Sequence, residues 1–243
     1  MTLLLAVAAL SASASKPFVD YGPANKFIEP SVHVIGGGST ILHNYRSTFG
    51  EIENLNTNMG ILLGAGGRAT FGFRDFFGVS TEFNILARNY NIDMSVVGHN
   101  QSSMSAVFIN SRTWSFSIPL LLTFRFNVAD GLRWNVDAGA YYSYGFAGTQ
   151  RQRLYVGRIN ELGQLVAERI DIKSDYYNSP ATFQNSFRRS DWGIHIGTSL
   201  DIGRHIRVGA RLQAGLKNTS FTHGISNPRV RNLDIAGMVG WRF

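Results

Sequence analysis

The sequence predicts an all-β fold, an eight-stranded antiparallel up-and-down β-barrel that crosses a membrane. Three observations lead to it: long segments with an apolar residue at every second position, connections that are short and long in strict turn, and aromatic residues gathered at the segment ends. A period of two is typical of a β-strand with one apolar and one polar face. Charged residues are only 16% of the chain, against about 25% in a typical soluble domain, so an outer surface that faces lipid fits the composition.

The first half of the chain contains four alternating segments. They are residues 31–43, 58–74, 78–90 and 113–126. The first is rich in glycine, and the next two place residues such as Ile61 and Phe83 on one face and Glu82 on the other. The fourth reads TWSFSIPLLLTFRF, and its apolar face meets no polar residue. Because ordinary strands have about 5–6 residues, we expect lipid rather than a protein core against so long a face.

The second half supplies four more segments and completes the pattern of connections. These segments are residues 132–146, 191–202, 206–217 and 231–243. Three connections are short (RDFFG, NVADG and GRH), and the four between them are long: about 44–57, 91–112, 147–190 and 218–230. Short periplasmic turns and long extracellular loops are typical of an outer-membrane barrel. The alternative is a soluble barrel or sandwich with an apolar interior, which has no reason to sort its loops by side.

The polar face carries charges of both signs, which we expect inside the barrel as a paired network. The residues are Arg68, Glu82, Arg125, Arg133, Asp137, Asp191, Asp201, Arg207, Arg211, Asp234 and Arg242. Aromatic residues of the apolar face form two expected girdles at the membrane interfaces. At the short-turn end these are Phe71, Phe73, Phe124, Phe126, Trp134, Trp241 and Phe243, and at the long-loop end Trp114, Tyr142, Tyr144, Phe146 and Trp192.

The N-terminus predicts export. The apolar run LLLAVAAL is followed by Ala12-Ser13-Ala14, a candidate cleavage site, although no positive residue precedes the run. We therefore expect a signal peptide at 1–14, a periplasmic segment at 15–30 and the barrel at 31–243. Without a positive region, the signal peptide is expected to be truncated at its start. The chain has no Cys, which excludes disulfides, thiolate metal sites and a lipid-modified N-terminal cysteine.

Several segments resemble one family of outer-membrane barrels. SIPLLLTFRF, a tight turn and LRWNVDAGAYYSYGF, with the later GIHIGTSLDIG and the terminal WRF, resemble the PorT-like or "porin family" barrels of Bacteroidota. The resemblance implies the eight-stranded fold and, for some members, an accessory role in protein secretion. Trp241 and Phe243 also resemble the terminal signal read by the outer-membrane assembly machinery, a partner during biogenesis, with the usual glycine displaced to Gly237.

No constellation in the sequence predicts catalysis, a cofactor or a metal site. Some eight-stranded barrels modify lipid A, so the six histidines were considered as catalytic candidates. His195 is expected inside among Asp191, Ser199 and Asp201, whereas such an enzyme needs its site on the outer wall. His-x-His and His-Glu-x-x-His spacings are absent. We therefore predict a non-enzymatic barrel.

The predicted role in the outer membrane is structural or surface-binding: membrane stabilisation, adhesion or service in a larger complex. Eight strands make a narrow barrel that side chains fill, so the charged network is expected to close it. A small passive channel is one alternative, and a PorT-type secretion accessory is another. The long loops offer a surface for a protein partner.

The longest connection predicts a contact with lipopolysaccharide. Residues 153–159 and 164–172 are expected to pair as a hairpin above the membrane. Its basic surroundings suit phosphate groups; the candidate contacts are Arg151, Arg153, Arg188 and Arg189. The net charge of +7 fits an anionic surface, but its scatter along the chain argues against nucleic acid.

Overall fold

A computed structural model of the chain describes residues 17–22, 25–97, 103–159, 164–177, 187–221 and 228–243. The expected signal peptide at 1–14 lies outside these residues. The strands are β1 (Phe27–His43), β2 (Ile52–Arg74), β3 (Phe77–Val97), β4 (Ser103–Ala129), β5 (Leu132–Ile159), β6 (Leu165–Asp175), β7 (Ser190–Ile202), β8 (Ile206–Gly215) and β9 (Val230–Arg242), with a short helix α2 (Tyr45–Thr48). Among the described residues, no helix has the length and apolar composition to cross a bilayer.

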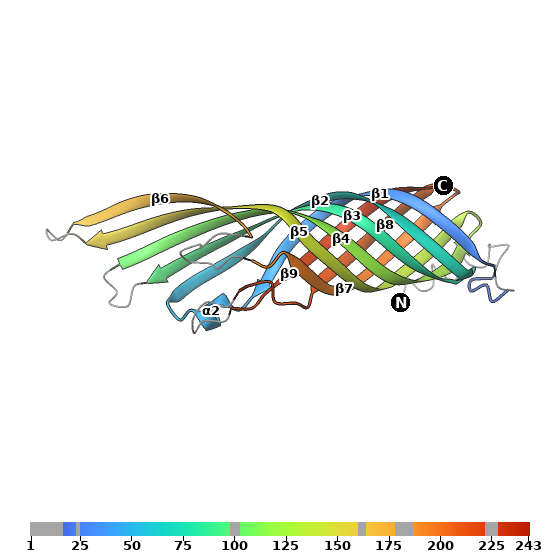
Figure 1. Cartoon of the computed structure of the whole chain (residues 1–243), viewed down its shortest axis with the longest axis horizontal. Helices are drawn as coiled ribbons and strands as arrows, with labels where there is room; N and C mark the ends of the chain where they lie inside the picture. The colour runs from blue at the N-terminus through green and yellow to red at the C-terminus, as the bar shows by residue number, and fades with distance from the viewer. Residues whose placement is uncertain (1–16, 23–24, 98–102, 160–163, 178–186, 222–227) are drawn as a thin grey trace.

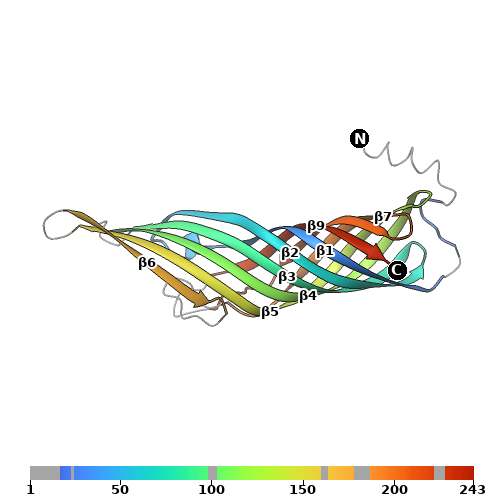
Figure 2. The same cartoon turned by 90° about the horizontal axis from the view of Figure 1, so that it is seen from above.

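Eight of the strands close into a ring, which confirms the predicted barrel. Neighbours pair antiparallel in the order β1-β2-β3-β4-β5-β7-β8-β9, and β9 returns to β1. Figures 1 and 2 show this ring, with the C-terminus at the end away from β6. The three short connections are tight turns as predicted, and Gly131 and Gly203 take the positive φ angles of 73° and 60° that two of these turns require.

Four strands of the ring continue far beyond it, where long loops were expected. β2 to β5 have 23, 21, 27 and 28 residues, whereas β7, β8 and β9 have 13, 10 and 13. Their distal parts join β6, which pairs with residues 149–159 of β5. We call this assembly the distal sheet; it comprises residues 52–59, 89–97, 103–112, 149–159 and 165–175. In Figure 1 it projects from one end of the barrel.

The loop predictions at 44–57, 91–112 and 147–190 were therefore wrong over much of their length. Residues 91–97 still alternate, as Ile92 and Met94 are buried while Asn91 and Asp93 are not. However, the apolar residues here occupy the inward positions, the opposite of the barrel pattern. A prediction that requires apolar residues at the outward positions therefore ends each strand too early. The expected hairpin at 153–172 is present, as the distal part of β5 with β6.

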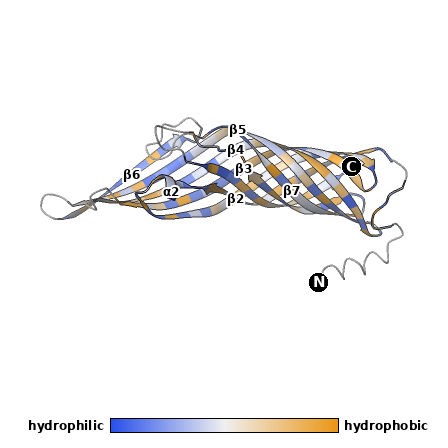
Figure 3. Ribbon diagram, turned by 90° about the horizontal axis from the view of Figure 1, so that it is seen from below, coloured by the Kyte–Doolittle hydropathy of each residue, from blue (hydrophilic) through white to orange (hydrophobic). Residues whose placement is uncertain are grey.

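The two faces of the barrel wall differ sharply in polarity. Outward positions carry exposed apolar side chains such as Ile61, Leu120 and Ile196, whereas inward positions such as Arg68 and Asp137 are buried and polar. Figure 3 shows the hydrophobic residues along the barrel strands and more hydrophilic ones in the distal part. Lipid against the wall accounts for this arrangement.

Candidate functional site

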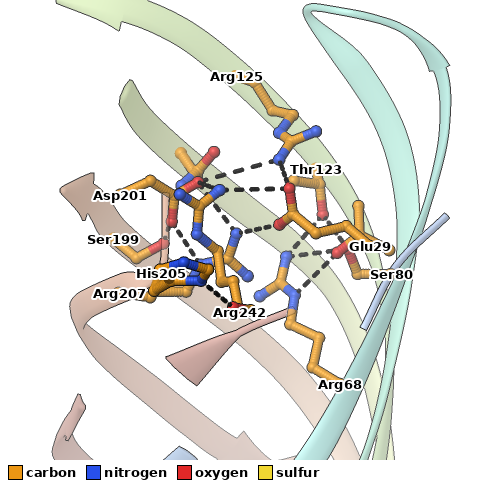
Figure 4. A network of polar contacts seen from close by, with 12 residues as sticks. Glu29, Arg68, Ser80, Thr123, Arg125, Ser199, Asp201, His205, Arg207 and Arg242 are labelled. Carbon is orange, nitrogen blue, oxygen red and sulfur yellow. Dashed lines mark hydrogen bonds and ion pairs between the residues drawn. The ribbon is translucent and has the colours of Figure 1, made fainter. Parts of the chain in front are cut away.

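The barrel interior is centred on Arg68 of β2. Its two terminal nitrogens each lie 2.7 Å from one carboxylate oxygen of Asp137 on β5, which is a bidentate ion pair. The same guanidinium reaches Glu82 on β3 at 3.4 Å and the hydroxyls of Ser80 and Thr123 at 2.9 and 3.0 Å. Figure 4 shows Arg68 directed at these two hydroxyls. One side chain thereby connects four strands across the lumen.

A second ionic layer closes the short-turn end. Arg207 donates to Asp201 at 2.6 Å and to Glu29 at 2.8 Å, and Arg125 donates to Glu29 at 2.6 Å. Arg242 lies between the two carboxylates, 3.2 Å from Asp201 and 3.3 Å from Glu29. Figure 4 shows these five side chains converging from several strands. Every charge here has an opposite partner, as buried ions require.

Glu29 belongs to this layer although the sequence analysis placed it in a periplasmic segment. β1 begins at Phe27, so Glu29 points inward in phase with Ser31. The signal was available, because Ile28 is outward and apolar. Pro30 hid it, since a proline within a run argues against a strand. Here Pro30 lies just before Ser31, the first residue of β1 that pairs with β9, and strand ends are positions where proline occurs.

A third layer lies at the other end of the barrel. Arg88 of β3 donates to Asp234 of β9 at 2.8 Å, and Ser39 donates to the other oxygen of Asp234 at 2.6 Å. Beside them the Tyr141 hydroxyl donates to Asp191 at 3.0 Å. The hollow lined by Arg88 and Asp191 has a volume of about 30 Å³, room for roughly two water molecules.

Ten of the eleven charged residues expected inside are buried, and Arg133 is half-buried. Arg88 and Glu29 are further members that were not predicted from the sequence. With them, six carboxylates (Glu29, Glu82, Asp137, Asp191, Asp201, Asp234) face six arginines (Arg68, Arg88, Arg125, Arg207, Arg211, Arg242). The opposite charges therefore balance within the lumen.

The buried histidines also belong to this interior. His195 hydrogen-bonds Gln213 at 3.0 Å, and His33 hydrogen-bonds Asn84 at 2.7 Å. His195 lies inside as expected, on the same buried face of β7 as Asp191, Ser199 and Asp201, and its hydrogen-bond partner is the side-chain amide of Gln213 on β8. Among the described residues, no group of three or more acidic or histidine side chains is arranged to hold a metal ion.

The distal sheet has an apolar interior of its own. Its buried cluster consists of Ile41, Tyr45, Ile52, Tyr90, Ile92, Met94, Val107, Ile109, Tyr176, Tyr177, Phe187 and Val230. Tyr176 stacks on Phe187 with 4.5 Å between ring centroids, and the Tyr90 hydroxyl donates to the Tyr176 hydroxyl at 2.9 Å. Burial raises the pKa of Tyr177 to about 12. The cluster therefore packs as a small core above the barrel.

The family of the chain follows from a comparison with known proteins. The family model described as "Outer membrane protein beta-barrel domain" matches residues 24–220. The chain belongs to this family. It is thus an outer-membrane β-barrel protein, as the sequence predicted, while the narrower PorT-like resemblance stays a prediction. A search of curated proteins found no match.

Solved structures of outer-membrane barrels are similar to this family member at low identity. Ail of Yersinia pestis, in complex with the heparin analogue sucrose octasulfate, is 11% identical with a TM-score of 0.37, covering 89% of this chain and 99% of its own. OprG of Pseudomonas aeruginosa is 12% identical with a TM-score of 0.32, covering 88% and 95%. Neisserial surface protein A is 8% identical with a TM-score of 0.32, covering 88% and 97%. These scores are low, so the family match carries the assignment.

The aromatic residues expected as girdles of this outer-membrane barrel lie mostly on its outer wall. Those at least a third exposed are Phe71, Phe73, Trp114, Phe124, Tyr142, Tyr144, Phe146, Trp192, Trp241 and Phe243. Phe126 and Trp134 are half-buried because they pack on each other, with ring centroids 5.4 Å apart. Phe18 covers Phe126 in turn, at 5.1 Å.

The four arginines expected to contact lipopolysaccharide lie in two different settings. Arg151 and Arg153 are exposed on the outward face of β5. Arg188 lies over the ring of Phe221, at 5.1 Å. Arg189 lies over a tyrosine ring and donates to two backbone carbonyls of β5 at 3.2 Å each. Arg189 is therefore bound to the barrel rim, and the β5 pair is the more available to a ligand.

Proposed function

We propose that this outer-membrane protein is a closed, non-enzymatic barrel that holds the distal sheet above the membrane as a binding surface. The role belongs to the structural or surface-binding class: membrane stabilisation, adhesion, or service as an accessory subunit. The observation that carries this proposal is the combination of a closed barrel interior with strands that extend far beyond the barrel. The lumen is filled by side chains, while four strands extend well beyond the membrane.

The filled interior supports closure. Arg68 lies in the ionic layer at the centre of the barrel, and Arg88 lies in the third layer described above. Between these two layers, the inner face of the wall carries an apolar cluster of Ile35, Leu62, Leu86, Ala236 and Met238. Ions cross a narrow eight-stranded barrel only if such side chains leave a water path. Ionic layers that alternate with an apolar cluster oppose such a water path.

Planar-bilayer recording tests closure against the alternative, a small passive channel. We expect no steady conductance from the refolded protein. The variant Arg68→Ala/Asp137→Ala removes the bidentate pair at the centre and is expected to conduct, provided that it keeps the heat-modifiable gel mobility of a folded barrel. Steady single-channel conductance of the unchanged protein would favour the channel instead.

The distal sheet supports a surface role. Its outward face carries the exposed rings of Phe108 and Tyr155, 44% and 38% exposed and in edge contact at 5.9 Å. Exposed aromatic residues are common anchors in interfaces. A photo-crosslinking residue at Phe108, in cells, tests for a protein partner, including one of a secretion complex. Crosslinks to one protein would support an accessory role, and crosslinks to lipid alone would oppose it.

We further propose lipopolysaccharide as a partner of the outward arginines, because guanidinium groups pair well with phosphates. Of the four candidates, the exposed Arg151 and Arg153 support this contact best. Release of bound lipopolysaccharide from the purified protein, measured by mass spectrometry, tests it. We also propose the outer-membrane assembly machinery as a partner during biogenesis, and the barrel fold supports this proposal.

A further inference from the structure

An apolar groove is hollowed into the outer wall of the barrel at its distal end. Its volume is about 580 Å³, within the range of about 300–1,000 Å³ that is typical of ligand sites. The outward side chains and glycine that line it include Ile61, Leu63, Gly64, Ala65, Ile85, Ala87 and Trp114. Small residues at Ala65 and Ala87 make the hollow, because larger side chains surround them. The groove faces the lipid and is shaped for a hydrocarbon chain.

A basic hollow adjoins the groove, and Arg112 lines both. This second hollow has a volume of about 160 Å³ and is lined by Asn110, Arg112, Thr149, Arg151 and Lys173. Arg151 of β5 and Lys173 of β6 are direct cross-strand partners, and Arg112 lies diagonally from Arg151, since it pairs with Thr149. Like charges directly opposite one another destabilise a sheet. An anion between the three cations would remove that repulsion.

No carboxylate is among the described residues that line this hollow. Asp175 lies opposite Thr149 on β6, where it accepts the backbone N–H of Tyr177 at 2.7 Å. None of Arg112, Arg151 and Lys173 forms an ion pair in the described part of the chain, whereas the nearby Asp171 is held by Arg169 at 2.7 Å. All three cations are exposed. Arg112 is the outward residue next above Trp114 of the outer aromatic girdle on β4, and Arg151 and Lys173 lie one outward row beyond it. Aromatic girdles lie at the level of lipid headgroups, so the cations lie where headgroup phosphates do.

Beside the cations the outward face is rich in amides, because Asn110, Asn91 and Asn58 continue the cross-strand row of Lys173 and Arg151. Asn110 donates to Asn91 at 2.5 Å and to Asn89 at 3.4 Å, and Asn58 donates to Asp93 at 3.1 Å. An amide both donates and accepts hydrogen bonds, and so it suits sugar hydroxyl groups. A phospholipid headgroup would not reach so large an amide face.

We propose that the outer wall of β2 to β6 binds one lipopolysaccharide molecule, with an acyl chain in the groove, phosphate on Arg112, Arg151 and Lys173, and inner sugars along the asparagines. Along β4, Trp114 of the groove, Arg112 and Asn110 follow one another in the order of the acyl chains, phosphates and sugars of that lipid. This site deepens the lipopolysaccharide contact proposed above and rests on it. It adds Arg112, Lys173 and the groove, and it excludes Arg188 and Arg189.

Native mass spectrometry of the refolded, full-length protein in detergent tests the site. The probes are a deep-rough lipopolysaccharide, which carries lipid A and its innermost sugars, and phosphatidylglycerol. The unchanged protein should bind one lipopolysaccharide. The variant R112Q/R151Q/K173Q should bind it at least roughly tenfold more weakly, because each cation near an anionic lipid contributes to affinity. The groove-filling variant Ala65→Phe/Ala87→Leu should lose affinity to a similar degree.

Matched controls separate the site from general effects of charge and volume. R46Q/R204Q/R231Q removes three exposed cations elsewhere, and Ala138→Phe/Ala140→Leu adds the same bulk to the lipid-facing wall of β5. Both should bind like the unchanged protein. Heat-modifiable mobility shows that each variant has folded.

Three results would overturn the site, each in a different way. Absence of lipopolysaccharide binding by the unchanged protein would overturn the partner as well, but not the closed barrel, which conductance tests. Retained binding by both site variants, with loss in R153Q/R188Q, would keep the partner and move the contact. Equal affinity for phosphatidylglycerol would reject the glycolipid.

Discussion

The same strands enclose two interiors of opposite character. Along β3, the inward residues of the barrel include Glu82 and Arg88, whereas those of the distal sheet are Tyr90, Ile92 and Met94. The outward residues change in the opposite sense. In the barrel they are apolar, such as Phe83, and beyond it on β3 they are the polar Asn89, Asn91 and Asp93. Both faces exchange polarity within a few residues of one another.

This exchange locates the outer surface of the membrane. A strand in lipid turns its apolar side chains outward, and its polar side chains face the interior, where they find hydrogen-bond partners. A strand in water must instead bury its apolar side. The change falls between Arg88 and Tyr90 on β3 and between Trp114 and Arg112 on β4. Solvent, rather than any change in backbone geometry, therefore decides which face of a continuous strand is apolar.

The largest expected effect comes from removing a charge from the barrel interior. Arg68→Met leaves the carboxylates of Asp137 and Glu82 without their shared partner, and breaking a buried pair costs about 3–5 kcal/mol. We expect the free energy of unfolding in detergent, followed by tryptophan fluorescence in guanidinium, to fall by that amount. The whole barrel should be affected, since this arginine connects four strands.

A double variant gives the matched control. Arg68→Met/Asp137→Leu replaces both partners of the bidentate pair by apolar groups. Much of the lost stability should return, because the carboxylate that pairs with Arg68 is then gone and Glu82 keeps Arg211 at 3.1 Å. If Arg68→Met alone had the same free energy of unfolding as the unchanged protein, ion pairing would not stabilise the barrel. The barrel and the distal sheet would then differ in the polarity of their interiors but not in the forces that stabilise them.

The barrel could be predicted from the sequence because its wall repeats one simple rule. Alternation along TWSFSIPLLLTFRF and the tight turns at Gly131 and Gly203 are local features. The distal sheet was not predicted because its apolar residues take the inward positions. A prediction that looks for apolar residues on the lipid-facing side does not find this alternation. The ion pairs could not be predicted individually, since Arg68 and Asp137 are 69 residues apart and meet only once the ring closes with a particular stagger.

A smaller effect should show where the membrane ends. Leu120 is 62% exposed on the outer wall, midway between the two girdles. Leu120→Arg should cost about 2–4 kcal/mol of unfolding free energy in lipid vesicles, the range for arginine at the bilayer midplane. Asn91→Arg, on the outward face of β3 beyond the exchange of polarity, should cost almost nothing. Equal costs at the two positions would place both in the same solvent and remove the boundary.

The smallest effect should be confined to the interior of the distal sheet. Tyr176→Phe removes the hydroxyl that accepts the hydrogen bond of Tyr90, and a buried hydrogen bond contributes about 1 kcal/mol. Amide hydrogen exchange should therefore quicken around Ile92 and Ile109 while the barrel amides keep their protection. Tyr155→Phe, which changes an exposed tyrosine of the same sheet, is the control and should leave both regions unchanged.

The spread of this effect matters more than its size. Stability differs between parts of a protein when they open as separate cooperative units. The barrel is closed by its own ring of hydrogen bonds, whereas the distal sheet depends on the aromatic cluster between its strands and the segment around Phe187. Exchange that quickened equally in β7 and β8 after Tyr176→Phe would mean that the two interiors unfold as one, and that the polarity exchange separates two solvents without separating two cooperative units.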